Sequence, residues 1–83
     1  MTEQPIRMYT TSWCGDCRRS KRFLQDHQIA FEEINIEQHP EAAQIVITLN
    51  HGARSVPTII FPDGSALVEP SNRALASKLG IPL

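Results

Sequence analysis

The two cysteines of this chain stand at the junction between a short apolar run and an amphipathic run. The segment that holds them is Trp13-Cys14-Gly15-Asp16-Cys17. The residues before it, Ile6 to Tyr9, include β-branched and aromatic side chains and are typical of a strand. The residues after it place apolar or small side chains at helical spacing. The sequence therefore puts two sulfur atoms where a strand gives way to a helix, and this is the strongest constraint on fold and chemistry.

The length and composition indicate one small globular domain, which we place over residues 1–83. A domain of this size buries only about 60–65% of the surface of its unfolded chain, so it should fold alone without much surplus stability. A formal net charge of −1 argues against nucleic acid as the main partner.

The first residues, Met1-Thr2-Glu3-Gln4-Pro5, carry neither a basic cluster nor an apolar leader, and no apolar run approaches membrane-spanning length. We therefore expect a cytoplasmic protein with no membrane partner, and we expect it to be a monomer. In a reducing compartment, a close cysteine pair more often serves redox chemistry or metal binding than a structural disulfide.

Hydrophobic spacing predicts the element order β-α-β-α-β-β-α. The first half contains a strand over Ile6 to Tyr9, a helix from about Gly15 to His27 and a strand over Phe31 to Ile36. The segment from Pro40 to Gly52 is ambiguous because its β-branched residues suit a strand. Its apolar positions nevertheless follow i, i+3, i+4, i+7, and a proline and a glycine flank it as start and stop signals, so we predict a helix.

The second half of the sequence predicts a β-hairpin and a C-terminal helix. A strand over Val56 to Phe61 leads into a turn over residues 62–65, and Ala66 to Val68 pairs back. Ser71 is the expected N-cap of the last helix, and Gly80 is its stop. The first two strands should be parallel because a crossover helix joins them, and the last two should be antiparallel.

The position of the cysteines predicts unequal roles. Cys14 lies at the first helical turn, where free backbone N–H groups and the positive end of the helix dipole favour a thiolate. Cys17 follows one turn later, within reach of a disulfide formed at Cys14, and lies on the inward face of the helix. We therefore predict that Cys14 attacks and that Cys17 resolves.

Other uses of a C-x-x-C pair remain as alternatives. A zinc or copper site would need further ligands, but His27, His39 and His51 lack the spacing that completes a C-x-x-C finger. A c-type haem is excluded because Arg18 follows Cys17 where histidine is required. A β-α-β-β-α-β copper chaperone is the main structural rival, and it would need a hairpin where we predict the second helix.

The chain as a whole resembles the glutaredoxin family. The residues that carry the resemblance are Cys14-x-x-Cys17 and Val56-Pro57-Thr58, with Tyr9-Thr10-Thr11-Ser12-Trp13, Asn35-Ile36-Glu37, Arg54-Ser55 and Asp63-Gly64-Ser65 similar to the mycoredoxins within it. The resemblance implies a thioredoxin fold, an α/β architecture with a central four-stranded mixed sheet flanked by three helices. It also implies a thiol-disulfide oxidoreductase with no tightly bound cofactor.

The resemblance also implies positions that bind the substrate or its thiol. Pro57 is expected after a cis peptide bond that brings the backbone of Val56 beside Cys14, where it could pair with a substrate backbone. Arg54 matches a position that contacts the carboxylate of the thiol co-substrate. Ser71 lies in a segment after the last strand, Glu69-Pro70-Ser71-Asn72, that differs from the glycine-containing segment of many glutathione-using relatives.

Two residues beside the cysteines are further candidates. Trp13 flanks Cys14 and is either an exposed platform for a thiol or partner, or an aromatic packed under the loop. Asp16 replaces the tyrosine of most family members. A carboxylate there suits the helix dipole but disfavours a nearby thiolate.

The resulting functional prediction is a glutaredoxin-like, mycoredoxin-type enzyme that reduces mixed disulfides with a low-molecular-weight thiol, mycothiol or else glutathione. Its partners would be that thiol, thiolated or disulfide-bonded proteins, and an NADPH-dependent reductase. One alternative is a thioredoxin-like hydrogen donor that thioredoxin reductase reduces directly. An alternative of another class is a metal or iron-sulfur module that uses the C-x-x-C pair.

Overall fold

The computed structural model describes residues 5–83 and contains alternating strands and helices in the predicted order. The elements are β1 (Ile6–Thr10), α1 (Gly15–Asp26), β2 (Phe31–Asn35), α2 (Pro40–Leu49), β3 (Thr58–Ile60), β4 (Ala66–Val68) and α3 (Asn72–Leu79). The expectation that the chain begins without a leader rests largely on residues 1–4, which lie outside the described residues. Over residues 5–83, no helix is long and apolar enough to cross a membrane.

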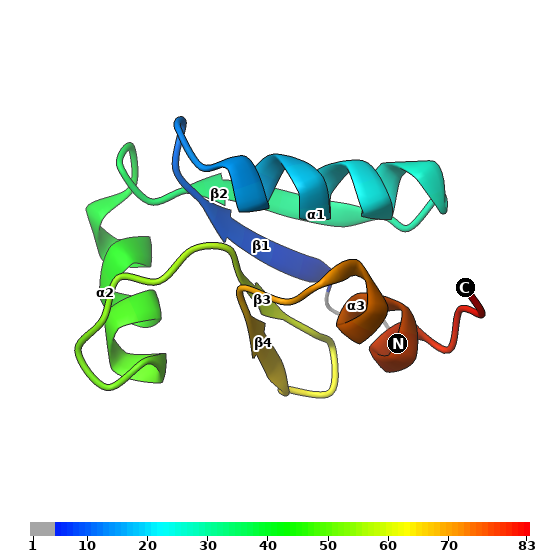
Figure 1. The fold of residues 1–83 in the computed structure, drawn as a ribbon. Helices are drawn as coiled ribbons and strands as arrows, with labels where there is room; N and C mark the ends of the chain where they lie inside the picture. The colour runs from blue at the N-terminus through cyan, green and yellow to red at the C-terminus, as the bar shows by residue number, and fades with distance from the viewer. Residues whose placement is uncertain (1–4) are drawn as a thin grey trace.

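The strands form one mixed sheet in the order β2-β1-β3-β4 (Figure 1). β1 pairs with β2 in parallel, with Ile6 opposite Phe31, and with β3 in antiparallel, with Met8 opposite Ile59. β3 and β4 form the predicted antiparallel hairpin. The thioredoxin fold and its four-stranded mixed sheet are thus confirmed.

The helices divide between the two faces of the sheet, each over its own apolar cluster. Residues of α1 and α3 pack on one face, in a cluster formed by Ile6, Met8, Phe23, Leu24, Ile59, Phe61, Leu75 and Ala76. α2 covers the other face, in a cluster formed by Tyr9, Ile36, Ala42, Ala43 and Val46. The β-branched residues of α2 therefore form a helix because their apolar spacing fits a second core.

The element boundaries differ from the sequence prediction mainly in the third strand. β3 covers only Thr58–Ile60, whereas we predicted Val56 to Phe61. Pro57 has no N–H to contribute to a strand ladder. At the other end, the N–H of Phe61 donates to the carbonyl oxygen of Ser65 at 2.8 Å and closes the turn. Elsewhere β1 gains Thr10, α1 ends at Asp26, and β2 ends at Asn35.

The closing helix has the predicted caps. The hydroxyl of Ser71 accepts a hydrogen bond from the N–H of Ala74 at 3.1 Å. Gly80 adopts a left-handed conformation with φ of 73°, which a residue without a side chain reaches at no steric cost. α3 therefore begins and ends where its sequence signals lie.

Candidate active site

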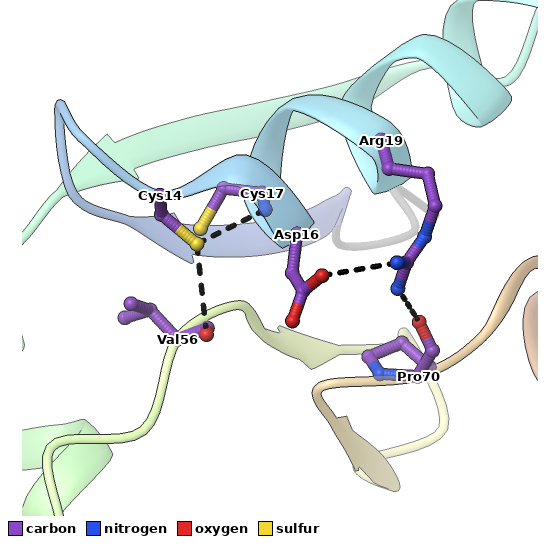
Figure 2. Close-up of polar contacts among 6 residues, drawn as sticks. All are labelled: Cys14, Asp16, Cys17, Arg19, Val56 and Pro70. Atoms are coloured by element: carbon purple, nitrogen blue, oxygen red, sulfur yellow. Dashed lines mark hydrogen bonds and ion pairs between the residues drawn. The ribbon is translucent and has the colours of Figure 1, made fainter.

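Cys14 is the N-cap of α1 and presents its sulfur to two backbone groups. Its Sγ accepts a hydrogen bond from the N–H of Cys17 at 3.0 Å, so the sulfur takes the place of the usual capping oxygen. The same sulfur lies 3.7 Å from the carbonyl oxygen of Val56, to which its thiol donates (Figure 2). An N–H group aimed at the sulfur stabilises negative charge there, which is the charge that a nucleophilic cysteine carries.

Cys17 is held as a neutral thiol inside the first turn. Both cysteines are free, and Cys17 is only 4% exposed. Burial, followed by its hydrogen bond with Cys14, raises the pKa of Cys17 to about 12, although a backbone hydrogen bond at Thr11 opposes this. The nearby charges of Cys14 and Asp16 act in the same upward direction. Cys17 is therefore protonated at neutral pH.

This difference predicts selective labelling of the reduced protein. At about pH 8, iodoacetamide should modify Cys14 in preference to Cys17, because an alkylating agent reacts with the thiolate form and the raised pKa of Cys17 keeps that thiol protonated. Labelling of Cys17 should increase only as the pH approaches the raised pKa of about 12. Peptide mapping of the alkylated protein measures both sites. Equal labelling of both cysteines at pH 8 in folded protein would contradict the difference in environment.

The loop before β3 carries the backbone that faces Cys14. The Val56–Pro57 peptide bond is cis, as the resemblance implied. Thr58 donates from its Oγ1 to the carbonyl oxygen of Ser55 at 2.7 Å, and Asn50 donates to the Thr58 hydroxyl at 3.2 Å. These contacts connect the end of α2 to the start of β3 and hold Val56 in place beside the sulfur.

Asp16 is paired with a residue of its own helix. Arg19 donates from Nη1 to the Asp16 carboxylate at 3.0 Å and from Nη2 to the carbonyl oxygen of Pro70 at 3.1 Å. Figure 2 shows the Asp16 carboxylate turned toward this arginine. Arg19 thus partly balances the charge beside the cysteines and connects α1 to the loop before α3.

Trp13 is exposed rather than packed under the loop, with 71% of its surface exposed. Its indole N–H donates to one carboxylate oxygen of Glu37 at 3.1 Å, and the N–H of Ser12 donates to the other oxygen at 3.1 Å. These bonds, with a smaller contribution from Arg54, hold the pKa of Glu37 below its usual value. Glu37 is therefore an oriented carboxylate beside Trp13, the residue that precedes the nucleophile.

The remaining predicted binding residues are Arg54 and Ser71. Arg54 is exposed and lines a groove of about 260 Å³ together with Thr11, Trp13, Ile36 and Glu37. Ser71 uses its hydroxyl to cap α3, next to the Pro70 carbonyl that Arg19 contacts. The structure thus joins Trp13 and Arg54 in one groove, whereas Asp16 is linked through Arg19 to the Pro70 carbonyl that precedes Ser71.

The described residues offer no ready-made metal ligand set. Among residues 5–83, no group of three or more His, Cys, Asp or Glu side chains lies close enough to hold an ion. His27, His39 and His51 are all exposed, as expected for surface residues.

Sequence reasoning missed two features of the site. The pairing of Arg19 with Asp16 could have been found from their i, i+3 spacing, although the contact to Pro70 could not. Glu37 belongs to the Asn35-Ile36-Glu37 segment that carries the resemblance, but its contacts in the site had no local signal, because its partners Ser12 and Trp13 lie 25 and 24 residues away in the chain.

Comparisons with known proteins agree with this geometry. Residues 6–66 match the glutaredoxin family model. A Mycobacterium tuberculosis protein named as a glutaredoxin is 44% identical over 79 residues, which cover 95% of this chain and 94% of the relative. Mycoredoxin 1 of Corynebacterium glutamicum is 30% identical over 74 residues, 89% of this chain and 91% of the relative.

One of the related solved structures belongs to a protein with a thioredoxin-like activity. The glutaredoxin-like NrdH-redoxin of Escherichia coli, whose structure is described as the basis of a thioredoxin-like activity profile, superposes with a TM-score of 0.65. It is 31% identical, and the match covers 77% of this chain and 80% of that chain.

Proposed function

Because this chain belongs to the glutaredoxin family and is a thiol-disulfide oxidoreductase, we propose that it reduces mixed disulfides between proteins and a low-molecular-weight thiol, with mycothiol as that thiol. The observation that carries the proposal is the position of the Cys14 sulfur. It receives a backbone N–H at 3.0 Å, faces the Val56 backbone and belongs to the residue that follows Trp13, which lines the groove. The likeness to mycoredoxin 1 favours mycothiol.

The first step is a thiol-disulfide exchange at Cys14. Its thiolate attacks the small-thiol sulfur of the mixed disulfide, the Cys14–thiol bond forms, and the protein sulfur leaves as a thiolate. The Val56 backbone then lies where an extended substrate segment would pair with it. The N–H of Cys17 stabilises negative charge on Cys14 before the attack.

The second step releases the small thiol from Cys14. A second thiol molecule attacks the bound one, which forms a symmetric small-molecule disulfide and returns Cys14 as thiolate. An NADPH-dependent reductase then supplies two electrons to that disulfide. Alternatively, Cys17 loses its proton and attacks Cys14, which releases the small thiol and leaves a Cys14–Cys17 disulfide. The cellular setting that we propose is a cytoplasmic monomer formed by one domain over residues 1–83.

The test compares small thiols on the wild-type protein. A model protein carrying mixed disulfides with mycothiol, glutathione or bacillithiol is offered under identical conditions, and release of each thiol is followed with time. We expect turnover of the mycothiol adduct at the highest rate. Failure to release any of the three thiols would refute the proposal, and a higher rate with glutathione or bacillithiol would refute the choice of mycothiol.

A second candidate function is a thioredoxin-like hydrogen donor. The activity described for the E. coli NrdH-redoxin supports it, and so does Cys17, which can close an intramolecular disulfide. The distinguishing experiment supplies NADPH and thioredoxin reductase without any small thiol. Reduction of the Cys14–Cys17 disulfide under these conditions would favour this candidate, which also requires Cys17 for every turnover.

A further inference from the structure

The groove lined by Trp13 contains two side chains of opposite charge. Glu37 supplies a carboxylate and Arg54 a guanidinium, and the two share the groove of about 260 Å³ with Trp13. Trp13 lines the groove and precedes Cys14 in the chain, and Arg54 lies two residues before Val56, whose carbonyl oxygen is 3.7 Å from the Cys14 sulfur. A small thiol attached to Cys14 can therefore reach this groove past Trp13.

The carboxylate of Glu37 is held in one orientation. It accepts hydrogen bonds from the Ser12 backbone and the Trp13 indole, each at 3.1 Å, and Glu37 is itself positioned by a bond of 2.8 Å from its own N–H to the Asn35 side chain. Asn35 also donates to the Ser12 hydroxyl at 3.0 Å. The network spans the loop after β1 and the end of β2, so the negative charge is held beside Trp13, the residue that precedes Cys14.

The positive charge of Arg54 offsets the negative charge of Glu37 only in part, because the two side chains form no ion pair. Arg54 takes part in none of the ion pairs found among residues 5–83, although its positive charge acts on Glu37. A neutral, hydroxyl-rich thiol can donate to Glu37 and accept from Arg54 without bringing charge. A thiol that bears carboxylates gains attraction from Arg54 but meets repulsion from Glu37.

We propose that Glu37 is a specificity-determining residue that disfavours carboxylate-bearing thiols such as glutathione and thereby favours neutral, hydroxyl-rich thiols of the mycothiol kind. This inference rests on the proposed de-thiolation reaction and names the feature that selects its co-substrate. The selection acts through charge in the groove and leaves the exchange step at Cys14 unchanged.

The test removes the charge of Glu37 while keeping its shape. In Glu37→Gln, the amide oxygen still accepts from the Ser12 backbone, and the groove keeps only the positive charge of Arg54. We expect kcat/KM for a glutathione mixed disulfide to rise by about three- to tenfold, as removal of one like charge at short range predicts. The value for a mycothiol mixed disulfide should stay equal or fall. The quantity measured is the ratio of kcat/KM for the glutathione mixed disulfide to kcat/KM for the mycothiol mixed disulfide.

A matched control separates local charge from net charge. Asp26→Asn changes the net charge by the same amount at the last residue of α1, where Asp26 pairs only with exposed Arg22. It should leave the substrate ratio unchanged. The effect of Glu37→Gln should also shrink at about 0.5 M salt, because exposed charges are screened there. A ratio equal to wild type, or a change insensitive to salt, would overturn the inference.

Two further readouts identify the cause of any change. Trp13 is the sole tryptophan of the chain, so its fluorescence should titrate in acid with Glu37, and this transition should be absent in Glu37→Gln and present in Asp26→Asn.

Arg54→Gln should shift the substrate ratio the opposite way, against glutathione, and tests the groove even if Glu37→Gln folds poorly. If wild-type protein releases neither thiol, the proposed function fails; if it releases them and the variants leave the ratio unchanged, only this inference fails.

Discussion

Replacement of Cys14 by serine is expected to reduce de-thiolation by more than about a thousandfold, as loss of a nucleophile does in other enzymes, whereas Cys17→Ser is expected to keep most of the activity. Cys14 carries the sulfur that a backbone N–H caps at 3.0 Å. Cys17 is buried, with its pKa raised to about 12, so it contributes little attacking thiolate at neutral pH.

The two variants also separate the candidate functions. Release of the small thiol from a model protein is measured with excess free thiol, which can complete the cycle without Cys17. Cys17→Ser is the matched control, because it removes a sulfur from the same turn and leaves Cys14 in place. Activity in Cys14→Ser would refute the assignment of the nucleophile. Complete loss in Cys17→Ser with excess thiol present would instead favour the thioredoxin-like route.

Leu24→Ala is expected to lower the free energy of unfolding by about 2–5 kcal/mol, the usual range for a buried leucine replaced by alanine. Leu24 is fully buried and joins α1 to the cluster that includes Ile59 and Leu75. The total free energy of unfolding of a small domain is about 5–15 kcal/mol, so this loss is a large share of its stability. Urea unfolding followed by circular dichroism measures the change.

The control for this loss is a leucine in a more exposed position. Leu49 ends α2 and is 43% exposed, so Leu49→Ala should cost less than about 1 kcal/mol. Equal losses in the two variants would contradict the packing described for α1. Because Cys14 and Cys17 belong to the first turns of the same helix, partial unfolding of Leu24→Ala should also reduce thiol exchange in proportion to the unfolded fraction.

The order of the elements could be predicted from sequence because local signals agreed with packing. Ile45 and Val46 by themselves suit a strand, yet Pro40 begins and Asn50 ends a helix whose inward side packs on the sheet. The boundaries of β3 were harder to predict from the sequence. Its length depends on a proline that cannot donate a ladder bond and on a turn that claims the N–H of Phe61.

The two cysteines and the cis bond before Pro57 were predictable because each depends on a motif. The helix start at Gly15 was also predicted, but the use of the Cys14 sulfur as the capping acceptor was not, because a thiol is not among the usual capping side chains. The carboxylate of Glu37 was equally hidden, because the contact with Trp13 exists only once β1 and β2 lie side by side.

The bond between the Cys14 sulfur and the Cys17 N–H gives one atom both a structural and a chemical task. A hydrogen bond to a charged acceptor is stronger than one to a neutral acceptor, so the thiolate of Cys14 accepts this bond more strongly than a disulfide sulfur does. The capping bond therefore favours the thiolate over the disulfide form of Cys14, and with it the step that returns Cys14 as a thiolate.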